Sequence, residues 1–225
     1  MGFLEVVVGD PGTGKSYFVT RHLALELAAL ERPHVVIYAS PNMDDDAPGW
    51  VLTSPALLRR TRRFELGDGG TAFLALRHAS GLEAVRIARA WSRVVRVLLV
   101  LDESHRVMPN YGQPWQEDYT AEERQELRAW VTELLRMGRH QPLSVLALSP
   151  TIAGLHPEIW RFARVTYYFH QGETSDQQTI ERRYGARAAL EVARLQPRQF
   201  IRAQRSSPPP GWTGYLATLE RKVRT

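Results

Sequence analysis

Residues 9–16 carry the clearest chemistry in the sequence. The segment reads Gly9-Asp-Pro-Gly-Thr-Gly-Lys15-Ser16, which is the pattern Gly-x-x-x-x-Gly-Lys-Ser. Glycines let the backbone turn so that successive N–H groups converge on one anion, while the lysine adds a charge and the serine hydroxyl a Mg²⁺ ligand. The pattern predicts a loop that holds the phosphates of a nucleotide. The predicted nucleotide-binding residues are Gly9, Asp10, Pro11, Gly12, Thr13, Gly14, Lys15, Ser16 and Tyr17.

Two carboxylates follow a second apolar run. Val97 to Leu101 is apolar throughout, and Asp102 and Glu103 come directly after it. Asp102 is predicted to hold Mg²⁺ opposite Ser16, partly through water, and Glu103 to orient and deprotonate an attacking water. Many strands end in such a pair, so the interpretation depends on the phosphate loop about 85 residues earlier. Together the two motifs predict binding and hydrolysis of ATP with Mg²⁺.

The elements around these residues must bring them together. The apolar run 4–8 leads into the loop and the amphipathic stretch 17–30 follows it, which predicts a strand, a loop and a helix. Periodicity predicts further strands at 34–39, 71–76, 97–101, 143–148 and 165–169, and helices at 82–95, 120–137, 157–161 and 186–195. The Pro-, Gly- and Asp-rich stretch 40–55 is expected to be a loop. These parts predict an α/β fold, a mainly parallel sheet with helices on both faces and the ligand at the carboxyl ends of the strands.

Composition sets the limits of the molecule. A chain of 225 residues with 44% apolar residues fits one domain with a small appendage. No run approaches the roughly 20 apolar residues of a membrane span, so no transmembrane segment is expected. The absence of cysteine excludes disulfides and thiolate metal sites. We expect a P-loop domain over 1–205, with its core at 3–170, and a proline-rich linker with a C-terminal segment over 206–225.

The basic residues are almost all arginine. Lysine occurs only at Lys15 and Lys222, so 27 of the 29 basic residues are arginine, and the net charge is +5. The absence of cysteine, with few asparagines and 14 prolines, hints at a thermophilic or GC-rich source. The charge permits a polyanionic partner without demanding one. Candidate DNA-contacting residues lie in the basic segment 57–64, which could equally be a solvated basic face: Arg59, Arg60, Arg62 and Arg63.

The motifs resemble those of the FtsK/HerA superfamily of DNA-pumping ATPases. The resemblance rests on residues 9–17, on Val100 to Arg106, on Arg136-Met-Gly-Arg-His140 and on Ser149-Pro150. It implies a RecA-like P-loop fold of the ASCE type and a homo-oligomeric, hexameric ring. It also implies that Arg136 or Arg139 reaches a neighbour's nucleotide, although a basic residue there could simply complement the helix dipole. Ser149 stands where the family usually has a glutamine that senses the γ-phosphate.

Two viral branches of this superfamily fit best. The first is the genome-packaging ATPase of tailless, membrane-containing viruses, which implies a motor that moves double-stranded DNA into a preformed capsid. Its partners would be double-stranded DNA and capsid or portal vertex proteins, in the host cytoplasm or the virion. The alternative is a Zot-like ATPase for filamentous phage assembly, acting on coat protein at a membrane. A nucleotide switch or small-molecule kinase is a third hypothesis, although no phosphoacceptor motif points to it.

Overall fold

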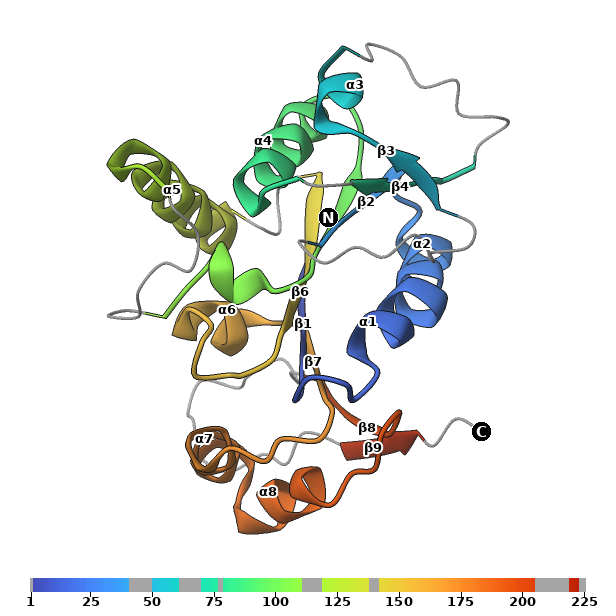
Figure 1. The fold of residues 1–225 in the computed structure, drawn as a ribbon. Helices are drawn as coiled ribbons and strands as arrows, with labels where there is room; N and C mark the ends of the chain where they lie inside the picture. The colour runs from blue at the N-terminus through green and yellow to red at the C-terminus, as the bar shows by residue number, and fades with distance from the viewer. Residues whose placement is uncertain are drawn as a thin grey trace.

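The computed structural model describes residues 2–40, 50–60, 70–76, 79–110, 119–137, 142–204 and 219–222. For residues 59, 60, 136, 137 and 219–222 it describes the backbone alone. These residues form a single central sheet with helices packed on its two faces (Figure 1). The predicted α/β fold with helices on both faces is therefore confirmed.

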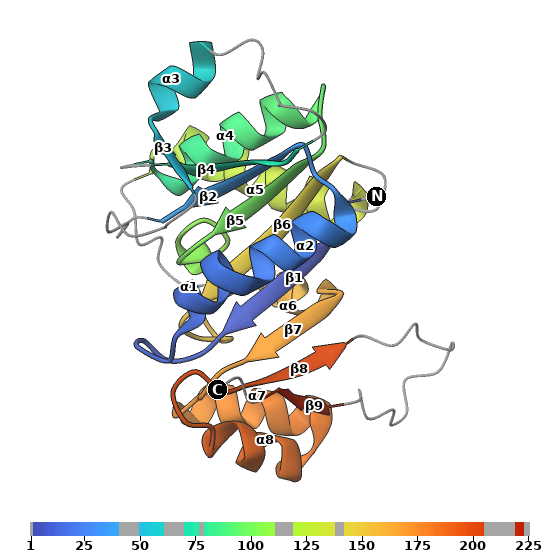
Figure 2. The same cartoon turned by 90° about the vertical axis from the view of Figure 1, so that its right-hand side faces the viewer.

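The sheet has nine strands within the described residues, in the order β3-β4-β2-β5-β6-β1-β7-β8-β9 (Figure 2). The strands are β1 (Leu4–Val8), β2 (Val35–Ala39), β3 (Val51–Thr53), β4 (Ala72–Leu76), β5 (Val97–Leu101), β6 (Leu143–Ser149), β7 (Val165–Tyr168), β8 (Phe200–Gln204) and β9 (Leu219–Lys222). The pairs from β3 through to β7 are parallel, and β8 and β9 add antiparallel pairs at one edge.

The central strands are apolar because both of their faces are covered. All five residues of β1, β2 and β5 are buried, as are all seven of β6. A parallel strand that is buried on both sides is expected to be a continuous apolar run instead of an alternating one. This is why the sequence pattern located these four strands to within a residue or two at each end.

Helices occupy both faces of the sheet. They are α1 (Lys15–Phe18), the π-helical turn η1 (Val19–Leu23), α2 (Ala24–Glu31), α3 (Pro55–Arg60), α4 (Gly81–Ser92), the 3₁₀ turn η2 (Ser104–Arg106), α5 (Ala121–Met137), α6 (Pro157–Phe162), α7 (Thr174–Tyr184) and α8 (Ala186–Ala193). In Figure 1 α1 and α2 lie on one side of the sheet and α4, α5 and α6 on the other. Two apolar clusters match these layers: one surrounds α1 to α2, and the other joins α4 to α8.

The structure differs from the sequence prediction at several places. The expected loop at 40–55 was wrong for Val51–Thr53, which forms β3; the strand has three residues with an exposed Val51, so no buried apolar run marked it. Helix α7 was not predicted because it is mostly polar. The helix after the phosphate loop contains the π turn η1, which periodicity does not reveal.

The C-terminal quarter of the described chain is joined to the sheet. Helix α8 forms where the sequence predicted a helix at 186–195, and strand β8 follows it. Strand β9 then pairs antiparallel with β8. The domain boundary expected after residue 205 lies outside the described residues, so it stays a prediction.

An ion-pair network holds the amino ends of the strands together. Arg164 pairs with the buried Glu5 of β1 at 2.8 Å and with Glu31 of α2 at 2.7 Å, and its guanidinium lies 4.2 Å from the ring centroid of Phe3. Burial raises the pKa of Glu5 above its ordinary value, and Arg164 opposes that shift. Arg164 therefore compensates a carboxylate that the fold has removed from water.

We expect Arg164→Ala to lower the free energy of unfolding by about 3 kcal/mol at pH 7, because it leaves the Glu5 charge buried without its partner. The loss should shrink as the pH falls toward 4, since a protonated Glu5 does not need a cation. Urea unfolding at the two pH values measures both effects. Glu31→Gln is the matched control: it removes the more exposed partner and should cost less than about 1 kcal/mol. An Arg164→Ala loss independent of pH would mean that packing on Phe3 matters instead.

Candidate functional site

The phosphate loop connects β1 to α1 at the carboxyl edge of the sheet. Gly12 and Gly14 have positive φ angles of 76° and 96°, a region that residues with a side chain rarely adopt. Gly9 is required for a different reason, because a Cβ there would lie 2.4 Å from the Cβ of Phe169. The sequence therefore folds locally into a tight turn at the start of a continuous helical segment. Backbone N–H groups at such a turn and helix start commonly bind phosphate.

Lys15 folds back over the loop that precedes it. Its ammonium group donates to the carbonyl oxygens of Gly9, at 2.5 Å, and Asp10, at 2.8 Å. Burial lowers its pKa, and the nearby carboxylates of Asp102 and Asp10 oppose that shift. Phosphate oxygens bound in the loop would stabilise this partly buried ammonium group through charge-assisted hydrogen bonds.

Ser16 and Asp102 meet across the intervening strand β6. The Ser16 hydroxyl donates to Oδ2 of Asp102 at 2.9 Å. Adjacent ligands of an octahedral Mg²⁺ ion lie about 3 Å apart when each is about 2.1 Å from the metal. Both groups offer the hard oxygen that Mg²⁺ prefers, so these two residues fit the predicted ion, with phosphate and water oxygens to complete its shell. Within the described residues no cluster of three or more acidic, histidine or cysteine side chains forms another metal site.

Glu103 lies next to Asp102 in a constrained backbone conformation. Its φ angle is 52°, in the left-handed region, and its N–H donates to Asp102 Oδ1 at 3.0 Å. Its carboxylate oxygen Oε2 lies 2.5 Å from Nε of Arg106, one turn along η2. The Ser104 hydroxyl fastens this turn to β6 by donating to the Leu148 carbonyl at 2.7 Å. Glu103 is thus held in position by its backbone and by Arg106.

Sequence reasoning missed the residues that orient Asp102. The hydroxyl of Tyr38, on β2, donates to Asp102 Oδ2 at 2.9 Å, and that of Ser40 does so at 3.4 Å. Burial and the Asp102 charge raise the pKa of Tyr38, so it stays protonated and donates. A small pocket lies beside the two acids, and Ser40, Asp102, Glu103 and Arg106 are among the residues that line it. These contacts form because β2 pairs with β5 in the sheet, and no local sequence motif indicates that pairing.

Ser149 is buried, and its hydroxyl is used within its own turn. It donates to the carbonyl of Thr151 at 2.7 Å and accepts from the Thr151 N–H at 3.3 Å. A glutamine does lie near the phosphate loop, but at position 171, after β7. With its amide oxygen turned toward the loop, Gln171 accepts from the Gly9 N–H at 2.7 Å and donates to Asp176 at 2.6 Å. The γ-phosphate sensor predicted at Ser149 stays a prediction.

Asp10 joins the phosphate loop to the segment after β7. Its Oδ2 accepts from the Gly172 N–H at 2.9 Å and lies 2.8 Å from Nδ1 of His170. Its backbone N–H donates to the His170 carbonyl at 2.8 Å. Asp10 therefore buttresses the loop from outside, a role that the sequence pattern did not distinguish from direct contact with the nucleotide.

The structure does not describe the side chains of the arginines predicted to contact DNA or a neighbouring nucleotide. Arg62, Arg63 and Arg139 lie outside the described residues, and for Arg59, Arg60 and Arg136 only the backbone is described. Arg59 and Arg60 end α3, and Arg136 lies in the last turn of α5. Their expected contacts with DNA or with a neighbouring nucleotide stay predictions.

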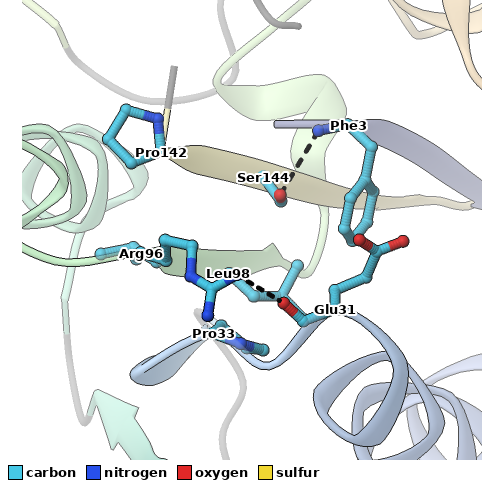
Figure 3. Close-up of a pocket in the computed structure, with 8 residues that line it drawn as sticks. Phe3, Glu31, Pro33, Arg96, Leu98, Pro142 and Ser144 are labelled. Atoms are coloured by element: carbon cyan, nitrogen blue, oxygen red, sulfur yellow. Dashed lines mark hydrogen bonds between the residues drawn. The ribbon is translucent and has the colours of Figure 1, made fainter. Parts of the chain in front are cut away.

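A second pocket lies at the opposite edge of the sheet (Figure 3). It is lined by Phe3, Glu31, Pro33, Arg96, Val97, Leu98, Pro142 and Ser144. Two hydrogen bonds join its lining residues: the Phe3 N–H donates to the Ser144 hydroxyl at 3.3 Å, and the Arg96 guanidinium donates to the Glu31 carbonyl at 3.3 Å. The pocket contains no residue of the phosphate loop or the acidic pair, so it is separate from the candidate site.

The fold and the site together define a class. A phosphate loop follows β1, an acidic pair follows β5, and the additional strand β6 lies between them. This is the α/β fold of the P-loop NTPases of the ASCE type. In the part of the chain that the structure describes, no helix is both long enough and apolar enough to cross a membrane.

Comparisons with solved structures agree with this class. The chain is similar to the genome packaging NTPase B204 from Sulfolobus turreted icosahedral virus 2 in complex with ATP-gammaS, with a TM-score of 0.67 and 16% identity over 98% of this chain and 96% of that chain. For the AMPPCP complex of B204 the TM-score is 0.62, with 17% identity over 90% and 92%. The DNA-packaging ATPase B204 from Sulfolobus turreted icosahedral virus gives 0.60, with 16% identity over 90% and 92%. No family model matches the sequence, and no curated protein matches it.

Proposed function

We propose that the protein hydrolyses ATP and uses the reaction to move double-stranded DNA into a preformed viral capsid. The hydrolytic part rests on the 2.9 Å contact between Ser16 and Asp102, which joins the phosphate loop to the acidic pair. The DNA part is supported by the fold similarity to B204, described as a genome packaging NTPase, and by the net charge of +5.

Each residue of the site has a role in this reaction. The loop N–H groups and Lys15 hold the β- and γ-phosphates, and Ser16 and Asp102 hold Mg²⁺. The ion, when bound, neutralises charge that develops on the phosphates. Glu103 accepts a proton from the attacking water, and Arg106 keeps its carboxylate in place. Tyr38 fixes the orientation of Asp102 through its hydrogen bond.

The motor as a whole needs parts that one chain does not supply. We infer a homo-oligomeric ring, a hexamer in line with the superfamily resemblance, in which Arg139 or Arg136 acts on the nucleotide of a neighbouring subunit. Phosphate contacts from Arg59, Arg60, Arg62 and Arg63 would grip DNA without reading its sequence, as packaging requires. Capsid or portal vertex proteins would anchor the ring, in the host cytoplasm or the virion.

We expect duplex DNA to stimulate ATP turnover by the wild-type protein. The stimulation should fade as salt rises from about 50 to 200 mM, because each phosphate contact releases counterions. Phosphate release with and without duplex DNA at the two salt concentrations measures the stimulation. The Lys15→Ala variant gives the background rate.

Two results would change the proposal in different ways. Turnover that ignores DNA at every salt concentration would overturn the DNA part and point to a protein substrate, as in phage assembly. Transfer of phosphate from ATP to a small molecule instead of water would identify a kinase.

A further inference from the structure

An exposed aromatic ring lies directly after the phosphate loop, with two arginine side chains beside it. Tyr17 follows Ser16 and is 54% exposed, so its ring is not packed in the core. The guanidinium of Arg198 lies 5.7 Å from its ring centroid, and that of Arg21 lies 5.9 Å from it. His22 approaches the same ring edge-on at 5.9 Å. The π turn that follows Tyr17 is a kind of irregularity that occurs often at functional sites.

Arg198 is fixed against the phosphate loop although it is far from it in sequence. Its backbone N–H donates to the Thr13 carbonyl at 2.9 Å, and its φ angle is 66°, in the left-handed region. A Cβ on Gly14 would lie 3.4 Å from its Cγ. Two residues later Phe200 packs against Phe18, with ring centroids 4.5 Å apart, which fixes β8 against α1. The contact of Arg198 with the loop is therefore built into the fold.

The direction of the phosphate chain places a nucleoside beside these residues. Ser16 and Asp102 fix the metal and γ-phosphate end of the loop toward β6 and β5. A nucleotide is linear through its phosphates, so its sugar and base leave the loop on the other side. On that side lie β7 and β8, with Arg198 just before β8 (Figure 2). Tyr17 and Arg198 are planar groups on that side, with the Arg198 guanidinium 5.7 Å from the Tyr17 ring centroid.

We propose that Tyr17 and Arg198 together form the binding surface for the base of the bound nucleotide. The inference rests on the proposed nucleotide binding and adds what the phosphate loop cannot supply, a surface for the nucleoside. An aromatic ring and a guanidinium plane both stack on the π face of a base. The segment before β8 thereby becomes part of the nucleotide site.

The test compares a nucleotide with its phosphate chain alone. Calorimetric titration with AMPPCP and with inorganic tripolyphosphate, both with Mg²⁺, separates the base from the phosphates. Tyr17→Ala and Arg198→Lys should each weaken AMPPCP binding about 10-fold to 100-fold, the range for loss of one stacking contact, and leave tripolyphosphate binding unchanged. Arg198→Lys keeps the charge and removes the plane, so it isolates stacking from electrostatics.

Matched controls make each outcome decisive. Arg187→Ala removes an exposed arginine from the neighbouring helix α8 and should change neither titration. Tyr17→Phe keeps the ring and should restore the AMPPCP affinity that Tyr17→Ala loses. Equal affinity of Tyr17→Ala, Arg198→Lys and wild type for AMPPCP would overturn the inference, as would an equal loss for both ligands. A wild-type protein that binds neither ligand would refute the proposed function itself, a result distinct from these.

Discussion

Lys15→Ala should abolish detectable nucleotide binding and, with it, ATP turnover. The ammonium group is the one lysine charge in the loop, and it is partly buried against the loop carbonyls. Its charge-assisted hydrogen bonds to phosphate are worth about 3 kcal/mol or more in such a site, which corresponds to a loss of affinity of at least about 100-fold. Calorimetric titration with ATP and Mg²⁺ measures this directly.

The fold should survive the change. Burial disfavours the Lys15 charge, so removing it should leave the free energy of unfolding within about 1 kcal/mol of wild type. Lys222→Ala, which removes the only other lysine of the chain, is the matched control and should bind ATP normally. If Lys15→Ala bound ATP with wild-type affinity while remaining folded, the assignment of residues 9–16 as the phosphate site would be wrong.

Glu103→Gln should separate binding from hydrolysis. Glutamine keeps the shape of the side chain beside Arg106 but cannot accept the proton of the attacking water. Loss of a positioned general base typically lowers the rate about 10²-fold to 10⁴-fold, so turnover should fall by that factor with ATP affinity unchanged. Single-turnover phosphate release, set beside equilibrium binding, resolves the two quantities.

The comparison variant for this test is Glu181→Gln, an exposed glutamate on α7, which should keep full turnover. Full turnover in Glu103→Gln would mean that another group accepts the proton. A parallel fall in binding and turnover would instead point to a structural role for Glu103, whose left-handed backbone already places it under constraint.

The part of the site that could be predicted is the part that is contiguous in sequence. The phosphate loop lies within eight residues and has its own backbone pattern, and the acidic pair follows a buried strand whose run of apolar residues is visible. The pattern of buried runs also predicted the parallel sheet, because strands covered on both faces are mostly apolar.

The remaining contacts of the site depend on which strands become neighbours in the sheet. The identity of a single residue does not reveal its neighbouring strand. Tyr38 reaches Asp102 because β2 pairs with β5, with Tyr38 opposite Val100. Gln171 reaches Gly9 because β7 lies beside β1. The contact of Arg198 with Thr13 spans most of the chain. Tertiary geometry sets these partners.

The position of β1 in the sheet has a consequence for how the protein is made. Its two neighbours are β6 and β7, with Leu4 opposite Val145 and Glu5 opposite Val165. Strand β1 therefore cannot pair until partners about 140 residues later in the chain have been synthesised, which makes this a high-contact-order step in folding. Because the Arg198 N–H also bonds to the loop at Thr13, a nascent chain can complete the candidate site only after residue 198 has been synthesised. A ligand bound there stabilises the finished fold over every shorter intermediate.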